Sequence, residues 1–243
     1  MHFCFDCLSE PTKRSDSNKE EPMAPTVLTY NQKGHRLFLR ALSSVCFSKS
    51  GAYYYALYHE NLSRRTCLFL LKEKQITDKT ALIDTIKWLI SEGKREEFNR
   101  LRHFLFTFSE SERTAYIQAL PEDHQSKSQL ILVDYYLRCL PSEGIAAHDY
   151  AWCILLSRAG LKLGYLQKDQ AIEYMLSAAR LAQQAYSGWN EYIAGFVAGI
   201  DFLIPDTSFQ TAKENRGFYT KLLASRHSPM RQVDWNVALN SNE

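Results

Sequence analysis

The segment from Trp189 to Ile200 limits the fold of this chain more strongly than any other feature. Its apolar side chains recur with the spacing of one face of an α-helix, at i, i+3, i+4, i+7, i+8 and i+11 (Trp189, Tyr192, Ile193, Phe196, Val197, Ile200). A half-buried β-strand would alternate apolar and polar residues instead. This segment therefore predicts a helix with one face packed against other elements.

Two similar stripes precede it, one from Ala147 to Arg158 and one from Ile172 to Tyr186. Short connections that contain glycine join the three segments, which favours neighbouring helices packed as hairpins. The chain has only 10 Gly and 7 Pro, too few for an all-β protein with many tight turns. We therefore predict an all-α fold, a compact multi-helix bundle of antiparallel helical hairpins with little or no sheet.

Helix start and stop signals occur in the middle of the chain. Thr77 is placed to cap a helix that Gly93 ends in a left-handed conformation. Ser109 and Glu112 form a capping-box pattern at the start of a further helix. Residues 128–140 form an apolar run that is too long for a typical strand, so a helix is predicted there as well.

The 243 residues are enough for one large domain. Residues 1–26 are polar and contain several prolines, so they predict a disordered leader. A single all-helical domain is expected over 27–225, its last helix within 208–225. Residues 226–243 show no clear periodicity and predict a loosely ordered tail.

Charge and hydropathy limit the partners and the location. The chain has 29 basic and 27 acidic residues, a balance that does not favour nucleic acid or an anionic membrane as partner. The mixed-sign run from Lys94 to His103 predicts a solvated helix face. No signal peptide and no apolar run of membrane-spanning length is present, and the six cysteines are scattered. We expect a soluble, cytoplasmic protein.

Two segments carry a resemblance to a known family. The first signature runs from Gly144 to Leu166 and includes His148-Asp149-Tyr-Ala-Trp and Leu-Ser-Arg158-Ala-Gly. The second signature, from Gln183 to Gly199, includes Gln-Gln-Ala-Tyr-Ser-Gly-Trp189-Asn-Glu191-Tyr. Together with weaker matches upstream, they resemble the bacterial domain of unknown function DUF1266 over about residues 50–204. The resemblance implies an all-helical domain and no assigned activity.

This chain departs from the family pattern at three places. Relatives tend to have an arginine where Trp152 stands, a basic residue directly after the glycine that matches Gly199, and an aromatic residue at the position of Leu203. Any polar cluster that those side chains build in relatives is expected to be incomplete or rearranged in this chain.

The candidate site consists of Asp149, Arg158, Trp189, Glu191 and Gly199. Asp149 and Arg158 lie nine residues apart, so on one helix they point to opposite sides. Arg158 is expected to pair with Glu191 across two helices and fix their register, and removing one partner of a buried pair costs about 3–5 kcal/mol. The alternative is a carboxylate–guanidinium pair that binds a ligand.

The other candidate residues have structural interpretations. Trp189 is expected to anchor the core, with ligand stacking as the alternative. Gly199 offers a smooth helix face for close packing, and His148 is expected to face away from its neighbour Asp149. The lone pair Cys4 and Cys7 has no second pair at zinc-site spacing, and nucleophile and phosphate-loop motifs are missing, so no metal and no cofactor are predicted.

These observations leave function classes open. The leading hypothesis is a non-catalytic helical protein that binds another protein as an accessory factor; the pattern gives no oligomeric state. A second is an enzyme or secreted bacterial effector with a polar site around Asp149, Arg158 and Glu191, which requires a pocket. A third is the immunity partner of a toxin.

Overall fold

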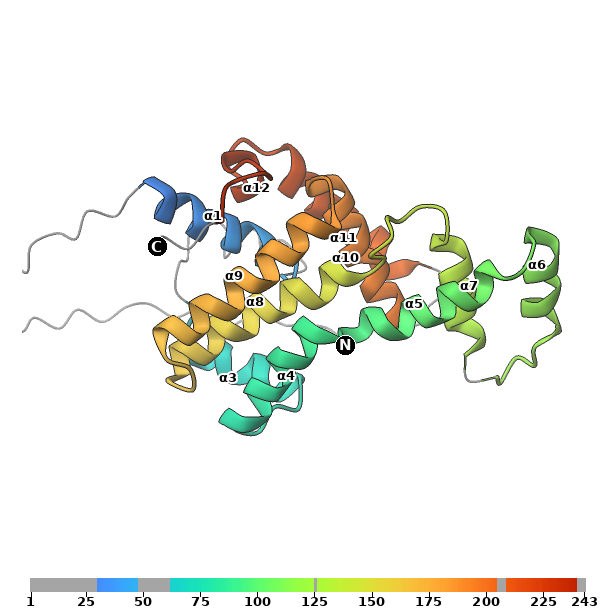
Figure 1. The fold of residues 1–243 in the computed structure, drawn as a ribbon, viewed down its shortest axis with the longest axis horizontal. Coiled ribbons are helices and arrows are strands. Elements are labelled where there is room, and N and C mark those ends of the chain that lie inside the picture. Colours follow the sequence, from blue (N-terminus) through green and yellow to red (C-terminus); the bar gives the residue numbers. More distant parts are fainter. Residues whose placement is uncertain (1–29, 48–61, 125, 205–208, 240–243) are drawn as a thin grey trace, which may run out of the picture.

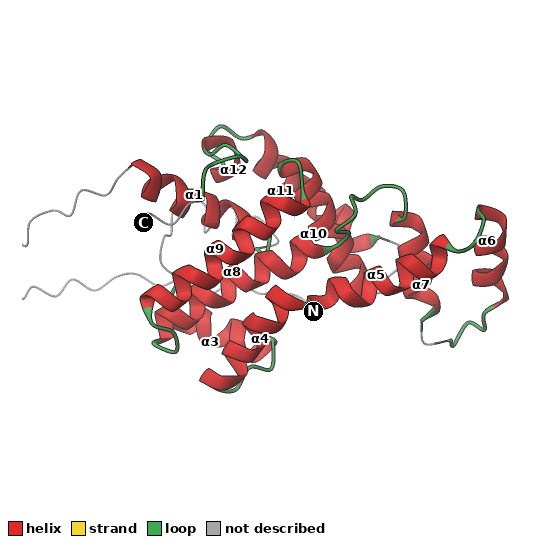
Figure 2. Cartoon of the chain, in the orientation of Figure 1, coloured by secondary structure: helices red, strands yellow, loops and turns green. Residues whose placement is uncertain are grey.

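The structure, a computed structural model, describes residues 30–47, 62–124, 126–204 and 209–239. All regular structure in these ranges is helical, as Figure 2 shows, and none of these helices is long and apolar enough to cross a membrane. The predicted all-α bundle is confirmed, whereas the predicted leader lies outside the described residues. The helices are α1 (Tyr30–Ser44), α3 (Arg64–Glu73), α4 (Lys79–Ser91), α5 (Gly93–Phe106), α6 (Glu110–Ala119), α7 (Lys127–Tyr136), α8 (Ala146–Leu163), α9 (Lys168–Ala185), α10 (Trp189–Leu203), α11 (Gln210–Ala224) and α12 (Pro229–Gln232).

Helix α8 lies at the centre of the fold (Figure 1). Helices α1, α3, α4, α5, α9 and α10 all pack against it, and 14 of its 18 residues are buried. The sequence stripe predicted one buried face, but α8 is buried on nearly all sides because neighbours surround it. At Gly160 the approach of α4 is so close that a Cβ atom would lie 2.6 Å from the Leu82 side chain.

The connection after α8 forms the predicted hairpin. Gly164 has a left-handed φ of +80°, and the amide of Tyr165 donates to the carbonyl of Gly160 at 2.9 Å. Helix α9 then runs back along α8, as Figure 1 shows. Helix α10 packs on α8 as well, and also contacts α5, α7 and α11.

The helix ends agree with the sequence signals with one correction. Asp78, not Thr77, caps α4, because its carboxylate accepts from the amide of Ala81 at 2.9 Å. Ser109 and Glu112 form the predicted capping box at the start of α6. Gly93 has a φ of +64°, follows Glu92 at the end of α4 and is also the first residue of α5.

Within the described ranges the buried apolar side chains form two hydrophobic clusters. The larger one surrounds α8 and extends to α1, α3, α4, α9 and the first half of α10. The smaller one joins α5, α6 and α7 to the end of α10, where the rings of Phe98 and Phe202 meet edge to face at 5.4 Å. Helix α6 lies at the end of the molecule opposite α1 (Figure 1).

The chain after α11 packs onto the bundle, which corrects the expectation of a loose tail for residues 226–239. Ser228 caps the short helix α12, and Met230, Trp235 and Leu239 are all buried. Their irregular spacing gives no helical or strand period, so the sequence pattern does not reveal their burial. Residues 233–239 are called the C-terminal segment below.

Candidate functional site

Asp149 is fully buried in the first turn of α8 and binds the start of another helix. Its two carboxylate oxygens accept from the amides of Lys94 and Arg95, each at 3.0 Å. These amides belong to the first turn of α5, whose own cap residue Glu92 makes no side-chain capping bond. Asp149 therefore supplies the negative charge that the positive end of α5 favours.

Gly93 makes this arrangement possible in two ways. Its φ of +64° lies in the left-handed region, which L side chains adopt at a cost. In addition, a Cβ atom at this position would overlap the carboxylate of Asp149. Conformation and space thus both require glycine at the α4–α5 corner.

Arg95 completes the hydrogen-bond network around Asp149, and this role was not predicted from the sequence. Its Nη1 lies 3.3 Å from Asp149 Oδ2, and the guanidinium donates to the carbonyls of Leu89 at 2.7 Å and Ile90 at 2.6 Å. Arg95 thereby ties the last turn of α4 to α8. We call Asp149, Arg95 and Gly93 the corner lock.

The prediction of a solvated face over the mixed-charge run is wrong for Arg95 and Arg102, which are both buried. Arg102 donates to the carbonyls of Leu140, Pro141 and Ser142. Both guanidinium groups satisfy main-chain carbonyls, a role that a charge pattern does not reveal. The one sequence signal near this site is Gly93, the glycine that was predicted to end the preceding helix.

His148 lies beside Asp149, contrary to the expectation that it faces away. Its Nδ1 is 3.6 Å from Asp149 Oδ1, and its ring stacks on Phe196 with centroids 5.7 Å apart. Burial lowers the pKa of His148, and the Asp149 carboxylate opposes that shift. Gly199 on α10 faces the imidazole, and a Cβ there would lie 2.5 Å from His148 Cβ. Gly199 thus serves close helix packing.

The structure does not bring Arg158 and Glu191 together. Arg158 donates from Nη1 to Ser43 Oγ on α1 at 2.9 Å. Glu191 accepts from the amide of Ser187 at 2.8 Å, and this hydrogen bond lowers its pKa. Within the described ranges no ion pair joins the two side chains, because the sequence spacing does not fix how α8 and α10 are rotated about their axes.

Trp189 packs in an aromatic cluster that joins α1, α10 and the C-terminal segment. Its ring lies 5.3 Å from that of Phe38, 6.2 Å from that of Tyr192 and 4.8 Å from that of Trp235. These contacts agree with the structural interpretation of Trp189 as an anchor of the core. The partner Trp235 could not be foreseen, because it follows no periodic pattern.

The described residues offer no group of three or more His, Cys, Asp or Glu side chains placed to hold a metal ion, and Cys4 and Cys7 lie outside them. Burial, with a smaller effect of Asp149, raises the pKa of the Cys153 thiol to about 12. A thiol so buried is protonated at neutral pH and is a poor nucleophile.

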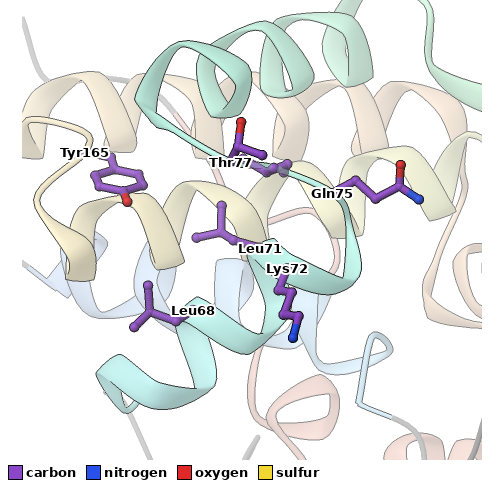
Figure 3. A pocket seen from close by; sticks show the side chains of 7 residues that line it. Leu68, Leu71, Lys72, Gln75, Thr77 and Tyr165 are labelled. Atoms are coloured by element: carbon purple, nitrogen blue, oxygen red, sulfur yellow. The ribbon is translucent and has the colours of Figure 1, made fainter.

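A surface hollow of about 280 Å³ lies between α3, the α3–α4 connection and the α8–α9 turn (Figure 3). It is lined by Leu68, Leu71, Lys72, Gln75, Ile76, Thr77 and Tyr165. None of the five candidate residues lines it. No local sequence pattern predicts this hollow, because its residues come from separate elements.

Comparison with known proteins places the chain among proteins without an assigned activity. It is 29% identical over 135 residues to the uncharacterized protein YbeR of Escherichia coli K12, a match that covers 55% of this chain and 57% of the relative. The chain thus aligns with little more than half the length of that protein. No solved structure matches. The family described as "Protein of unknown function (DUF1266)" matches residues 72–235, most of the chain, and the chain therefore belongs to this family.

Proposed function

We propose that this protein binds another protein and acts as a non-catalytic accessory factor. The observation that carries the proposal is the hollow beside α3, which is open to solvent and largely apolar. Leu68 on its rim is 48% exposed and extends the apolar lining of the hollow to the surface, where a partner side chain can contact both. The corner lock, by contrast, uses its polar groups internally.

The charges near the hollow indicate the chemistry of the partner. Lys72 lines the hollow and supplies a positive charge beside Leu68 and Leu71. A lysine beside leucine side chains suits a helix or loop that inserts an apolar side chain and carries a carboxylate next to it.

The alternative of an enzyme or effector needs Asp149, Arg158 and Glu191 around one pocket. Asp149 is fully buried against α5, Arg158 reaches Ser43, and Glu191 accepts from the amide of Ser187 just before α10. This geometry favours a binding function. A toxin as partner is a special case of the proposal, which co-expression with the product of the adjacent gene tests.

The experiment uses a photo-crosslinking amino acid at position 68 of the full chain, expressed in cells, to capture the partner. The same amino acid at position 204 is the control, because Ile204 is 59% exposed at the end of α10, away from the hollow. The captured protein is then purified, and its dissociation constant is measured with the wild-type chain.

The variant Leu68→Asp is expected to weaken this binding at least ~10-fold, about 1.4 kcal/mol, because it places a charge in an apolar contact. Ile204→Asp is expected to leave the dissociation constant within about twofold. Equal affinity of the folded Leu68→Asp variant and the wild type would contradict the proposal.

We also place this binding in the cytoplasm. Cys46, Cys67, Cys139 and Cys153 are free thiols, which reducing compartments maintain. Cell fractionation with an antibody against the chain tests this location, and recovery from the periplasm or the medium would contradict it.

A further inference from the structure

The C-terminal segment is held on the bundle largely through its main chain. Gln183 on α9 donates from Nε2 to the carbonyls of Trp235 at 2.5 Å and Val237 at 3.0 Å. One side chain therefore holds two part-buried acceptors, two residues apart, in a non-helical stretch.

Two further side chains continue this pattern towards the end of the segment. Arg180, also on α9, donates from Nη2 to the carbonyl of Leu239 at 2.9 Å. His35 on α1 has its Nε2 2.6 Å from the carbonyl of Ala238. Because the acceptors are main-chain oxygens, these contacts do not depend on which side chains the segment carries at 236–238.

Selectivity comes from two buried anchors, Trp235 and, four residues later, Leu239. The indole of Trp235 donates to the carbonyl of Tyr186 at 3.0 Å. Its ring lies within 6 Å of three other aromatic rings, those of Phe38, Trp189 and Tyr192. A pocket for a large aromatic anchor beside main-chain contacts is typical of a peptide-binding groove.

The residues that build this groove come in large part from the second signature. Gln183, Tyr186 and Trp189 all contact Trp235. A second hollow of about 280 Å³ remains beside the segment, lined by Arg180, Gln183 and residues 236–239. The described residues therefore leave some space beside the segment unfilled.

We propose that this groove between α1 and α9 is a peptide-binding site for partner segments of the form Trp-x-x-x-Leu, and that the C-terminal segment occupies it as an internal ligand. The groove is separate from the hollow beside α3, so the inference goes beyond the proposed function and stands or falls independently of it. The partner is a protein with an extended segment in which tryptophan and leucine are four residues apart.

The covalent connection of the C-terminal segment to the bundle determines how strongly the segment competes with such a partner for the groove. The C-terminal segment follows α12 directly, and the short stretch Ser225–Ser228 joins α12 to α11, so the segment stays beside the groove at an effective concentration on the order of mM. A free peptide therefore binds the wild-type chain weakly and binds tightly once the internal segment is weakened.

The test titrates a fluorescent, C-terminally amidated peptide with the sequence of residues 232–239 into full-length chains. Trp235→Ala removes the internal anchor and is expected to bind the peptide at least ~10-fold more tightly than the wild type. The peptide in which tryptophan is replaced by alanine is expected not to bind, and Gln183→Ala added to Trp235→Ala is expected to weaken binding ~10-fold.

A second measurement covers the case in which Trp235→Ala fails to fold. A protease site is placed at Arg226–His227 in the otherwise unchanged chain, and the chain is cleaved after folding. The released piece is expected to stay bound until an excess of unlabelled peptide displaces it, as followed by size-exclusion chromatography.

The outcomes are distinct. Binding to Trp235→Ala or exchange from the cleaved chain supports the inference, and a dimer of Trp235→Ala with wild-type chains supports it with a second copy as the source of the segment. The inference is overturned if a folded Trp235→Ala chain does not bind the peptide, or if no excess of peptide displaces the released piece from the cleaved chain. The groove is then only a structural contact.

Discussion

The corner lock and the peptide groove hold distant parts of the chain together in different ways. In the lock, the buried carboxylate of Asp149 accepts hydrogen bonds from two amides and faces a guanidinium group, so the contact depends on this one carboxylate. In the groove, three side chains share the main-chain carbonyls of the C-terminal segment. The lock can therefore be broken at one carboxylate, whereas the contact with the C-terminal segment is spread over several side chains.

The strongest way to break the lock is Asp149→Ala. The change leaves Arg95 buried without its charge partner and two amides without an acceptor, so the free energy of unfolding should fall by about 3–5 kcal/mol. Urea unfolding followed by circular dichroism measures the change. Asp84→Ala on the exposed face of α4 is the control and should stay within about 0.5 kcal/mol of the wild type.

A second test of the lock compares the stability cost of replacing two glycines with positive φ. Gly93→Ala should destabilise the chain about 2 kcal/mol more than Gly164→Ala, since only the first would also displace the Asp149 carboxylate. A Cβ at Gly164 meets no atom within 4 Å, so its cost is conformational alone. Equal losses in urea unfolding would show that Asp149 moves aside freely.

A single substitution in the groove should have a smaller and more local effect on stability. Gln183→Ala removes two hydrogen bonds and should cost about 1–2 kcal/mol. Amide hydrogen exchange should accelerate in residues 233–239 and not at Lys94 and Arg95. Gln184→Ala, on the exposed neighbour of Gln183, should change neither measurement.

The smallest effect concerns Arg158 and Glu191. A double-mutant cycle with Arg158→Ala and Glu191→Ala should give a coupling energy below about 0.5 kcal/mol, because the two side chains bind Ser43 and Ser187 separately. A coupling of several kcal/mol in urea unfolding would restore the interhelical pair that the sequence pattern suggested.

The helices were largely predictable from local signals. The apolar stripe of α10, the capping box at Ser109 and the glycine end at Gly164 each depend on residues a few positions apart, so a single segment contains the information. The family resemblance was likewise visible in two continuous segments.

The candidate site was less predictable because it depends on how helices are placed and rotated. Asp149 was identified, but its partner Arg95 lies in a run of mixed charges that resembles a solvated surface. Trp235 and Leu239 follow no period, so only tertiary packing shows that they are buried. The prediction of an Arg158–Glu191 pair was wrong for the same reason, because spacing along two helices does not determine which faces meet.

The way Asp149 caps α5 has a consequence for the order in which the chain assembles. The acceptor for the Arg95 amide lies 54 residues further along the chain. During synthesis the first turn of α5 therefore leaves the ribosome well before the carboxylate that completes it. Until the start of α8 has been translated and has docked, the amides of that turn have only water as their acceptor.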